Sequence, residues 1–134
     1  MADRFAEAFA EYAHHKVRTE FWGYAAKESL DNEAFIKEEY QGIRPAPGYP
    51  SCPDHRLKND IWDLLDVEKK INISLTDSLA MWPTASVSGL YFSHPQSRYF
   101  QLGRIDKDQV ETYSKARGES IDENETWLSP VLGY

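Results

Sequence analysis

The residues from Arg44 to Tyr49 combine two groups that recognise small polar ligands. They read Arg-Pro-Ala-Pro-Gly-Tyr, so a forked cation and an aromatic face are carried by a backbone that prolines restrict. An arginine can hold a carboxylate through two parallel hydrogen bonds, and Gly48 allows a ligand to approach the backbone closely. This loop therefore favours an amino-acid-like ligand over an apolar one.

A second interpretation of the same loop is a proline-rich connector that carries a surface arginine. Four prolines and one glycine within residues 43–53 exclude a helix or an interior strand there. Because prolines fix φ before folding, such a loop loses less entropy when it takes a fixed shape. That property suits a preorganised ligand surface, but the spacing alone leaves both interpretations open.

The sequence gives weaker support for a metal site or for a catalytic nucleophile. Cys52 and His55 have the Cys-x-x-His spacing of half a zinc site, but a second thiolate and a spaced histidine pair are lacking. The serines that precede His94 lack the Gly-x-Ser-x-Gly elbow of a nucleophile. We therefore expect no metal bound directly by the chain and no serine nucleophile.

The helices that position this loop are marked by apolar spacing and by capping residues. Apolar residues four apart from Phe5 to Phe21 predict an amphipathic helix over residues 2–22. Asp31 as N-cap and Gly42 as a stop predict a second helix. Further helices are predicted by the apolar stripe from Leu57 to Leu65, by the capping-box variant Asp106–Gln109 with Gly118 as its stop, and by Ser120.

Short aromatic and β-branched runs predict strands in the second half of the chain. Ser86–Phe92 and Arg98–Leu102 flank turn formers at residues 93–97, which predicts an antiparallel hairpin. Its cross-strand neighbours would be Tyr91, Phe92, Tyr99 and Phe100. The expected fold class is α+β, helix-rich with a small antiparallel β-hairpin or sheet, in a single domain or domain fragment over residues 1–134.

Composition excludes several classes of function. With 22 acidic against 15 basic residues, the chain has a formal net charge of -7 and no basic run that follows a phosphate backbone. No apolar stretch approaches the roughly 20 residues that span a bilayer, and the N-terminus lacks the layout of a secretory signal. The single Cys52 agrees with a reducing compartment. We therefore expect a cytoplasmic protein with no nucleic-acid or membrane partner.

Three blocks of sequence, taken in order, carry a family resemblance. The first is residues 44–50, Arg-Pro-Ala-Pro-Gly-Tyr-Pro, with Pro-Asp-His at residues 53–55 after it. The others are residues 78–83, Ser-Leu-Ala-Met-Trp-Pro, and residues 85–95, which begin Ala-Ser-Val-Ser-Gly-Leu-Tyr-Phe. Over essentially its whole length the chain resembles the activation domain of vitamin B12-dependent methionine synthase. This resemblance decides against the connector interpretation.

The resemblance implies the C-terminal part of a methionine synthase activation-domain fold that binds S-adenosylmethionine. It also implies that the methyl group of this ligand is presented to cobalamin held by a separate domain. Inactive cob(II)alamin is thereby reductively methylated, or reactivated, within methionine biosynthesis. The electron is expected from flavodoxin or a diflavin reductase, and the chain acts as part of a methyltransferase.

The alternative function is a non-catalytic interaction module that docks to the cobalamin domain or to flavodoxin. Weak or absent ligand binding with retained partner binding would favour it. A free-standing methyltransferase is disfavoured, because no glycine-rich loop follows a predicted strand and no general base stands beside a substrate pocket.

The resemblance also implies ligand contacts by matching position. Arg44 is expected to contact the ligand's carboxylate, Glu7 its amino group, and Tyr49 the methyl-bearing sulfonium near the corrin, a positioning role in catalysis. The family often has tyrosine where this chain has Phe100, so the hydroxyl is missing there. The full set of expected S-adenosylmethionine contacts is Glu7, Arg44, Pro45, Ala46, Gly48, Tyr49, Tyr99 and Phe100.

The family's domain is longer than this chain, and its first half has no counterpart here. We expect either an excised fragment or one piece of a split enzyme, and not a complete methionine synthase. An exposed strand edge or apolar patch, left by the missing half, is expected to cause self-association.

Overall fold

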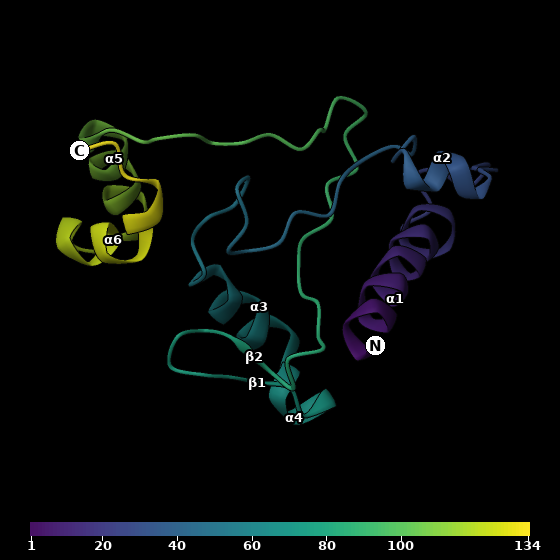
Figure 1. Ribbon diagram of the computed structural model, residues 1–134, viewed down its shortest axis with the longest axis horizontal. Helices are drawn as coiled ribbons and strands as arrows, with labels where there is room; N and C mark the ends of the chain where they lie inside the picture. The colour runs from purple at the N-terminus through teal and green to yellow at the C-terminus, as the bar shows by residue number, and fades with distance from the viewer. The chain divides into compact units, whose positions relative to one another are not determined.

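The computed structural model describes residues 1–134, which group into two compact units. Unit 1 consists of Met1–Pro45 and Ile73–Tyr99, and unit 2 consists of Ala46–Asn72 and Phe100–Tyr134. Helices and irregular loops make up most of the chain, with one small sheet (Figure 1). None of the helices is both long and apolar enough to cross a lipid bilayer.

Helix α1 (Ala2–Lys16) opens unit 1 and continues into a π-helical turn, η1 (Val17–Phe21). An acidic side chain lies in the first turn of α1 and basic side chains lie in its last, which matches the helix dipole at both ends. Gly23 follows with φ +73°, a left-handed conformation that ends the helix. The predicted helix over residues 2–22 is therefore confirmed.

The aromatic stripe of α1 faces solvent, whereas its polar face is buried. Phe5, Phe9 and Tyr12 are 70%, 68% and 55% exposed. On the opposite side of the helix, His14 and Arg18 have no exposed surface. The amphipathic pattern is present, but the polar face is the one that packs. Exposed apolar patches of this kind are typical of interaction surfaces.

Helix α2 (Asn32–Ile36) begins where expected and ends early. The Asp31 carboxylate accepts a hydrogen bond from the Ala34 N–H at 2.9 Å, which confirms the predicted N-cap. Glu38 then takes φ +54°, and the N–H of Glu39 donates to the Ala34 carbonyl at 3.0 Å. This is a Schellman closure without glycine, so the predicted end at Gly42 is wrong.

The sheet consists of two short antiparallel strands in unit 1, β1 (Ser74–Leu75) and β2 (Met81–Trp82). Ser74 pairs with Trp82, and Leu75 pairs with Met81. The helix-rich α+β class with a small antiparallel sheet is therefore confirmed, although the strands lie earlier in the chain than expected.

The predicted hairpin between residues 86–92 and 98–102 does not form, and each segment bonds to the proline-rich loop instead. In unit 1, Ile43 and Phe92 exchange two backbone hydrogen bonds of 2.9 and 3.0 Å. In unit 2, the Leu102 N–H donates to the Pro50 carbonyl at 3.2 Å. The prediction that residues 91, 92, 99 and 100 are cross-strand neighbours is therefore wrong.

The prolines of the loop explain this outcome. Each proline lacks an N–H but keeps its carbonyl, so the loop offers acceptors to a neighbouring segment. The Leu90 N–H, for example, donates to the Pro45 carbonyl at 3.0 Å. Because an edge with so few donors supports only isolated bridges, residues 43–53 contain no regular strand, as the sequence predicts.

In unit 2, helix α3 (Leu57–Leu65) follows the loop, and a left-handed residue separates it from α4 (Val67–Ile71). That residue is Asp66, with φ +53°. The helix predicted from its apolar stripe is confirmed. The acidic residues between positions 60 and 68 are exposed, as on a solvated helix face.

Helices α5 (Lys107–Arg117) and α6 (Ile121–Leu128) lie side by side near the C-terminus, and the 3-10 turn η2 (Ser129–Val131) follows them (Figure 1). The predicted starts and stop are confirmed: a capping box opens α5, Gly118 ends it with φ +70°, and Ser120 caps α6. The apolar core of this part consists of Ile105, Val110 and Leu128.

Candidate ligand site

Arg44 lies in unit 1 beside the segment that pairs with the loop. Its N–H donates to the hydroxyl of Tyr99 at 2.9 Å, and the carbonyl of the next residue, Pro45, accepts from Leu90. Arg44 and Tyr99 are expected ligand contacts 55 residues apart, and a direct hydrogen bond joins them. The Arg44 side chain therefore leaves a backbone that is held in place.

Three hydrogen bonds hold the Arg44 guanidinium. Nη2 donates to Glu11 Oε2 at 2.5 Å, and Nη1 donates to the Tyr40 hydroxyl at 2.7 Å and to His14 Nδ1 at 3.1 Å. An arginine carries five N–H donors, so Nε–H and one N–H of Nη2 remain without a partner in the chain. A carboxylate accepts hydrogen bonds from guanidinium donors of this kind, and it binds two of them at once where they lie side by side.

His14 is a neutral acceptor for Arg44. Its ring has no exposed surface, stacks on Tyr91 with centroids 5.0 Å apart, and meets the Tyr40 ring at 5.1 Å. Burial above all, and then the charges of Arg18 and Arg44, lower the pKa of His14 from 6.5 to about 3. Because Nδ1 accepts from Arg44, the proton of the neutral ring lies on Nε2.

Arg18 is a second cation in this network and is fully buried. Its Nε and Nη2 donate to the two carboxylate oxygens of Glu28 at 2.8 and 2.9 Å. Its Cζ is 3.9 Å from the centroid of the Tyr40 ring, and the Cζ of Arg44 is 6.0 Å from the same centroid. Burial raises the pKa of Tyr40 to about 12, so its hydroxyl is neutral at ordinary pH. Two arginines thus share one ring, each with its own carboxylate.

In unit 2, Gly48 and Tyr49 belong to a tight turn. The Gly48 N–H donates to the Cys52 carbonyl, and the Cys52 N–H donates to the Tyr49 carbonyl, both at 2.8 Å. Tyr49 is 64% exposed, so its ring is accessible to a ligand or a partner. Burial raises the pKa of the Cys52 thiol, which agrees with a packed rather than a reactive cysteine.

The ring of His55 packs directly against Gly48. Gly48 has φ +96°, and a Cβ added there would lie 2.2 Å from His55 Cε1. Lys58 holds the ring in turn, because its Nζ is 2.8 Å from His55 Nδ1. Backbone conformation and space both require glycine at this position. Gly48 therefore has a structural reason that is independent of any ligand.

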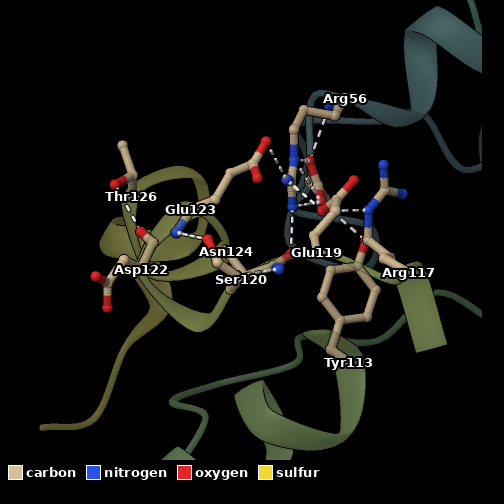
Figure 2. Close-up of polar contacts among 10 residues, drawn as sticks. Arg56, Tyr113, Arg117, Glu119, Ser120, Asp122, Glu123, Asn124 and Thr126 are labelled. Carbon is tan, nitrogen blue, oxygen red and sulfur yellow. Dashed lines mark hydrogen bonds and ion pairs between the residues drawn. The ribbon is translucent and has the colours of Figure 1, made fainter. Parts of the chain in front are cut away.

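An ion-pair cluster in unit 2 fixes the start of α3 (Figure 2). Arg56, 6% exposed, donates from Nε and Nη2 to Asp54, which is 3% exposed. Its Nη atoms also reach Glu119 at 2.6 Å and Asn124 at 2.5 Å (Figure 2). The Tyr113 hydroxyl donates to Asp54 at 2.8 Å. The cluster thereby ties α3 to α5 and α6.

Comparison with known proteins places the chain in a family. The model of the vitamin B12 dependent methionine synthase activation domain matches residues 1–118. The chain belongs to this family. It is also similar to a solved structure, the crystal structure of the MetH reactivation domain bound to AdoHcy, with a TM-score of 0.95 and 60% sequence identity. That match covers 98% of this chain and 41% of the other, so the chain spans less than half of the solved one.

The contacts expected for an activation domain divide between the two units. Glu7 is exposed on α1, and Phe100 is 56% exposed. The structure joins Arg44 to Tyr99 and places Gly48 and Tyr49 in one turn. The roles of these residues as ligand contacts stay predictions. Unit 1 holds Glu7, Arg44, Pro45 and Tyr99, and unit 2 holds Ala46, Gly48, Tyr49 and Phe100.

Sequence reasoning missed the side chains that hold the expected contacts of this activation domain in place. Glu11, His14 and Arg18 recur at i, i+3 and i+7, so a shared helix face is visible in the sequence. No local pattern pairs that face with Arg44, because Glu11 and Arg44 are 33 residues apart. The ring of His55 packs on Gly48, and no group of three or more His, Cys, Asp or Glu side chains is placed to hold a metal ion.

His14 is expected to make the activation domain less stable as the pH falls. Its folded pKa is about 3 against an ordinary 6.5, so below that ordinary value only the unfolded state takes up the proton. From His14 alone, the free energy of unfolding should fall by up to about 1.4 kcal/mol per pH unit in this window. Urea unfolding of the wild type and of His14→Asn across the window measures this contribution.

Asparagine is the matched replacement, since it keeps an acceptor near the place of Nδ1 and does not titrate. The difference in slope between the two proteins therefore separates the histidine from the carboxylates, which also lose favourable partners in acid. Parallel pH dependences of the two proteins would contradict a neutral, buried His14.

Proposed function

We propose that the chain binds S-adenosylmethionine and supports the reductive methylation of cob(II)alamin, the reactivation of cobalamin-dependent methionine synthase in methionine biosynthesis. The observation that carries this proposal is the 60% identity, over 98% of the chain, to a reactivation domain bound to AdoHcy. AdoHcy is S-adenosylhomocysteine, which is S-adenosylmethionine without its transferable methyl group. Such a ligand presents an α-carboxylate, an α-ammonium group and an adenosine.

Arg44 supports the proposal through the two N–H donors that the chain leaves unbonded. Its side chain is 24% exposed, so the guanidinium is partly shielded from water and still accessible. In this proposal those donors receive the α-carboxylate of the ligand. Charge-assisted, bidentate bonds of this kind are stronger and more directional than neutral ones.

The other proposed contacts in unit 1 are Glu7, Tyr99 and the backbone of Pro45. Glu7 lies one helical turn before Glu11, which contacts Arg44. Because side chains four residues apart share a helix face, a ligand with its carboxylate at Arg44 can direct its ammonium group toward Glu7. The Tyr99 hydroxyl fixes the Arg44 backbone, so Tyr99 supports that contact as well.

In unit 2 we assign a positioning role to Tyr49, whose exposed ring can stabilise the sulfonium cation near the corrin. Gly48 and Ala46 offer backbone groups from the turn and the residues before it. Phe100 offers an exposed aromatic face without a hydroxyl.

The remaining components come from outside the chain in this proposal. Cobalamin is held by a separate module of methionine synthase, and flavodoxin or a diflavin reductase supplies the electron. S-adenosylmethionine supplies a methyl group that leaves the sulfonium without its bonding electron pair. The residues of this chain bind and orient the ligand, so the chain works as part of a methyltransferase.

Calorimetric titration of the purified chain with S-adenosylmethionine tests the proposal. We expect saturable binding, which Arg44→Ala should weaken by about 10- to 100-fold, the range of hydrogen bonds to charged groups. Lys37→Ala is the matched control, because it removes an exposed cation at the C-cap of α2 and should leave the affinity unchanged.

The outcome also separates the two candidate functions. Absence of binding by a folded wild-type chain would contradict ligand recognition by this segment. Retained binding to the cobalamin module or to flavodoxin would then favour the interaction module. Equal weakening by Arg44→Ala and Lys37→Ala would point to a nonspecific charge effect.

Self-association of the isolated chain is part of the same proposal. The aromatic stripe of Phe5, Phe9 and Tyr12 supports it, because this stripe is exposed along one side of α1. A surface of this kind gains free energy when another molecule covers it.

A further inference from the structure

We propose that Glu11 is a positioning residue for ligand recognition, which holds the Arg44 guanidinium so that its unbonded edge faces a carboxylate. This inference rests on the proposed function, because it explains how the assigned contact at Arg44 gets its orientation. Glu11 acts through Arg44 and is not itself a contact of the ligand.

The ion pair between the two side chains is direct and partly shielded from water. Glu11 Oε2 accepts from Nη2 of Arg44 at 2.5 Å, with the two side chains 32% and 24% exposed. Glu11 Oε1 is buried and has no hydrogen-bond partner. The carboxylate therefore directs its hydrogen bonding to Arg44 alone. Partly buried pairs are screened less by salt than surface pairs are.

The charges around Arg44 explain why a carboxylate is needed there. Arg18 lies against the same Tyr40 ring, and Glu28 already takes two of its hydrogen bonds. His14 is neutral, so it neither repels Arg44 strongly nor balances its charge. Without Glu11, Arg44 would stand near a second guanidinium with only neutral partners, and solvent would compete for it.

Glu11 also decides which donors of the fork stay free. Glu11, Tyr40 and His14 bond three N–H groups on Nη1 and Nη2, which leaves the Nε–H and one N–H of Nη2. A guanidinium fixed in this way loses less conformational entropy when a ligand binds. Released from Glu11, the side chain can rotate, and the free edge no longer has one direction.

Titration with two ligands distinguishes positioning from other roles. AdoHcy carries the α-carboxylate, whereas its decarboxylated analogue keeps the amino group and the adenosine. Glu11→Ala is expected to weaken AdoHcy binding by about tenfold and to leave binding of the analogue unchanged. Glu11→Gln, which keeps an acceptor, should recover part of the loss. Glu33→Ala removes a carboxylate that is 75% exposed on α2 and should change neither affinity.

Two results would overturn the positioning role. Equal losses for both ligands would show that Glu11 contacts another part of the ligand or supports the fold in general. Tighter binding of AdoHcy by Glu11→Ala would show that Glu11 competes with the ligand for Arg44.

A measurement without ligand separates this inference from the proposed function. With isotope-labelled arginine in the wild-type chain, hindered rotation of the Arg44 guanidinium should give resolved Nη proton signals by NMR. These signals are assigned to Arg44 by their loss in Arg44→Lys. Glu11→Ala should average these signals, and Glu11→Gln should do so only in part. Resolved Arg44 signals in Glu11→Ala would refute the positioning role. If the signals of Glu11→Ala are averaged but the wild-type chain binds no ligand, only the proposed function is refuted.

Discussion

Arg56→Met is expected to lower the free energy of unfolding by about 3–5 kcal/mol, the cost of leaving a buried charge without its partner. Asp54 is 3% exposed and accepts from both Nε and Nη2 of Arg56. Burial alone would raise the pKa of Asp54, but the hydrogen bonds from Arg56 hold it below its ordinary value. The variant leaves a carboxylate that must stay charged in a poorly solvated place or take up a proton.

Urea unfolding, followed by circular dichroism, measures this loss. Lys69→Met is the matched control, because Lys69 is 83% exposed in a surface ion pair of unit 2. This variant should lower the free energy of unfolding by less than about 1 kcal/mol. Adding Asp54→Asn to Arg56→Met removes the unpaired charge and should restore part of the stability. A double variant no more stable than Arg56→Met would show that lost packing, and not the charge, causes the effect.

Gly48→Ala is expected to lower the free energy of unfolding by about 2–4 kcal/mol, through two separate costs. The first is the backbone, because φ +96° is a conformation that side chains with a Cβ rarely adopt. The second is the clash of the new Cβ with the His55 ring, 2.2 Å away. Lys58 is 5% exposed and its Nζ is 2.8 Å from Nδ1 of this ring, so the ring cannot easily move.

A double-variant cycle separates these two costs. His55→Ala removes the ring and opens the space, so it should relieve the clash but not the backbone strain. The two changes together should therefore cost less than the sum of the single ones, by about 1–3 kcal/mol. Additive losses in urea unfolding would contradict the contact between His55 and Gly48. Because this turn carries Tyr49, the same variants should also be titrated with S-adenosylmethionine.

Helix starts could be predicted from the sequence because capping is a local interaction. Asp31 and Ser120 each accept from an N–H three residues later, and both were identifiable from residue type alone. The end of α2 could not be predicted, since Glu38 takes a left-handed conformation that sequence rules assign to glycine. The hairpin failed for a different reason: its segments bond to the proline-rich loop, and strand partners are not encoded in local alternation.

In the candidate site, too, local features could be predicted from the sequence and contacts between distant residues could not. The residue types of the loop predict the chemistry of Arg44, because a guanidinium offers the same fork in any surroundings. They do not predict Glu11 or His14 as its partners, because those contacts depend on how α1 packs. Gly48 was assigned to close ligand approach, yet the ring of His55 already accounts for it.

The proline-rich edge also limits how copies of the chain can meet. Residues 43–53 give carbonyls to neighbouring segments, but the prolines at positions 45, 47, 50 and 53 remove N–H groups from the edge. A strand added by a second copy would lack donors there, which blocks fibril-type growth through the backbone. Contacts between copies are then left to side chains such as those of Phe5 and Phe9. Aggregates that form through residues 43–53 are accordingly expected to give no cross-β diffraction.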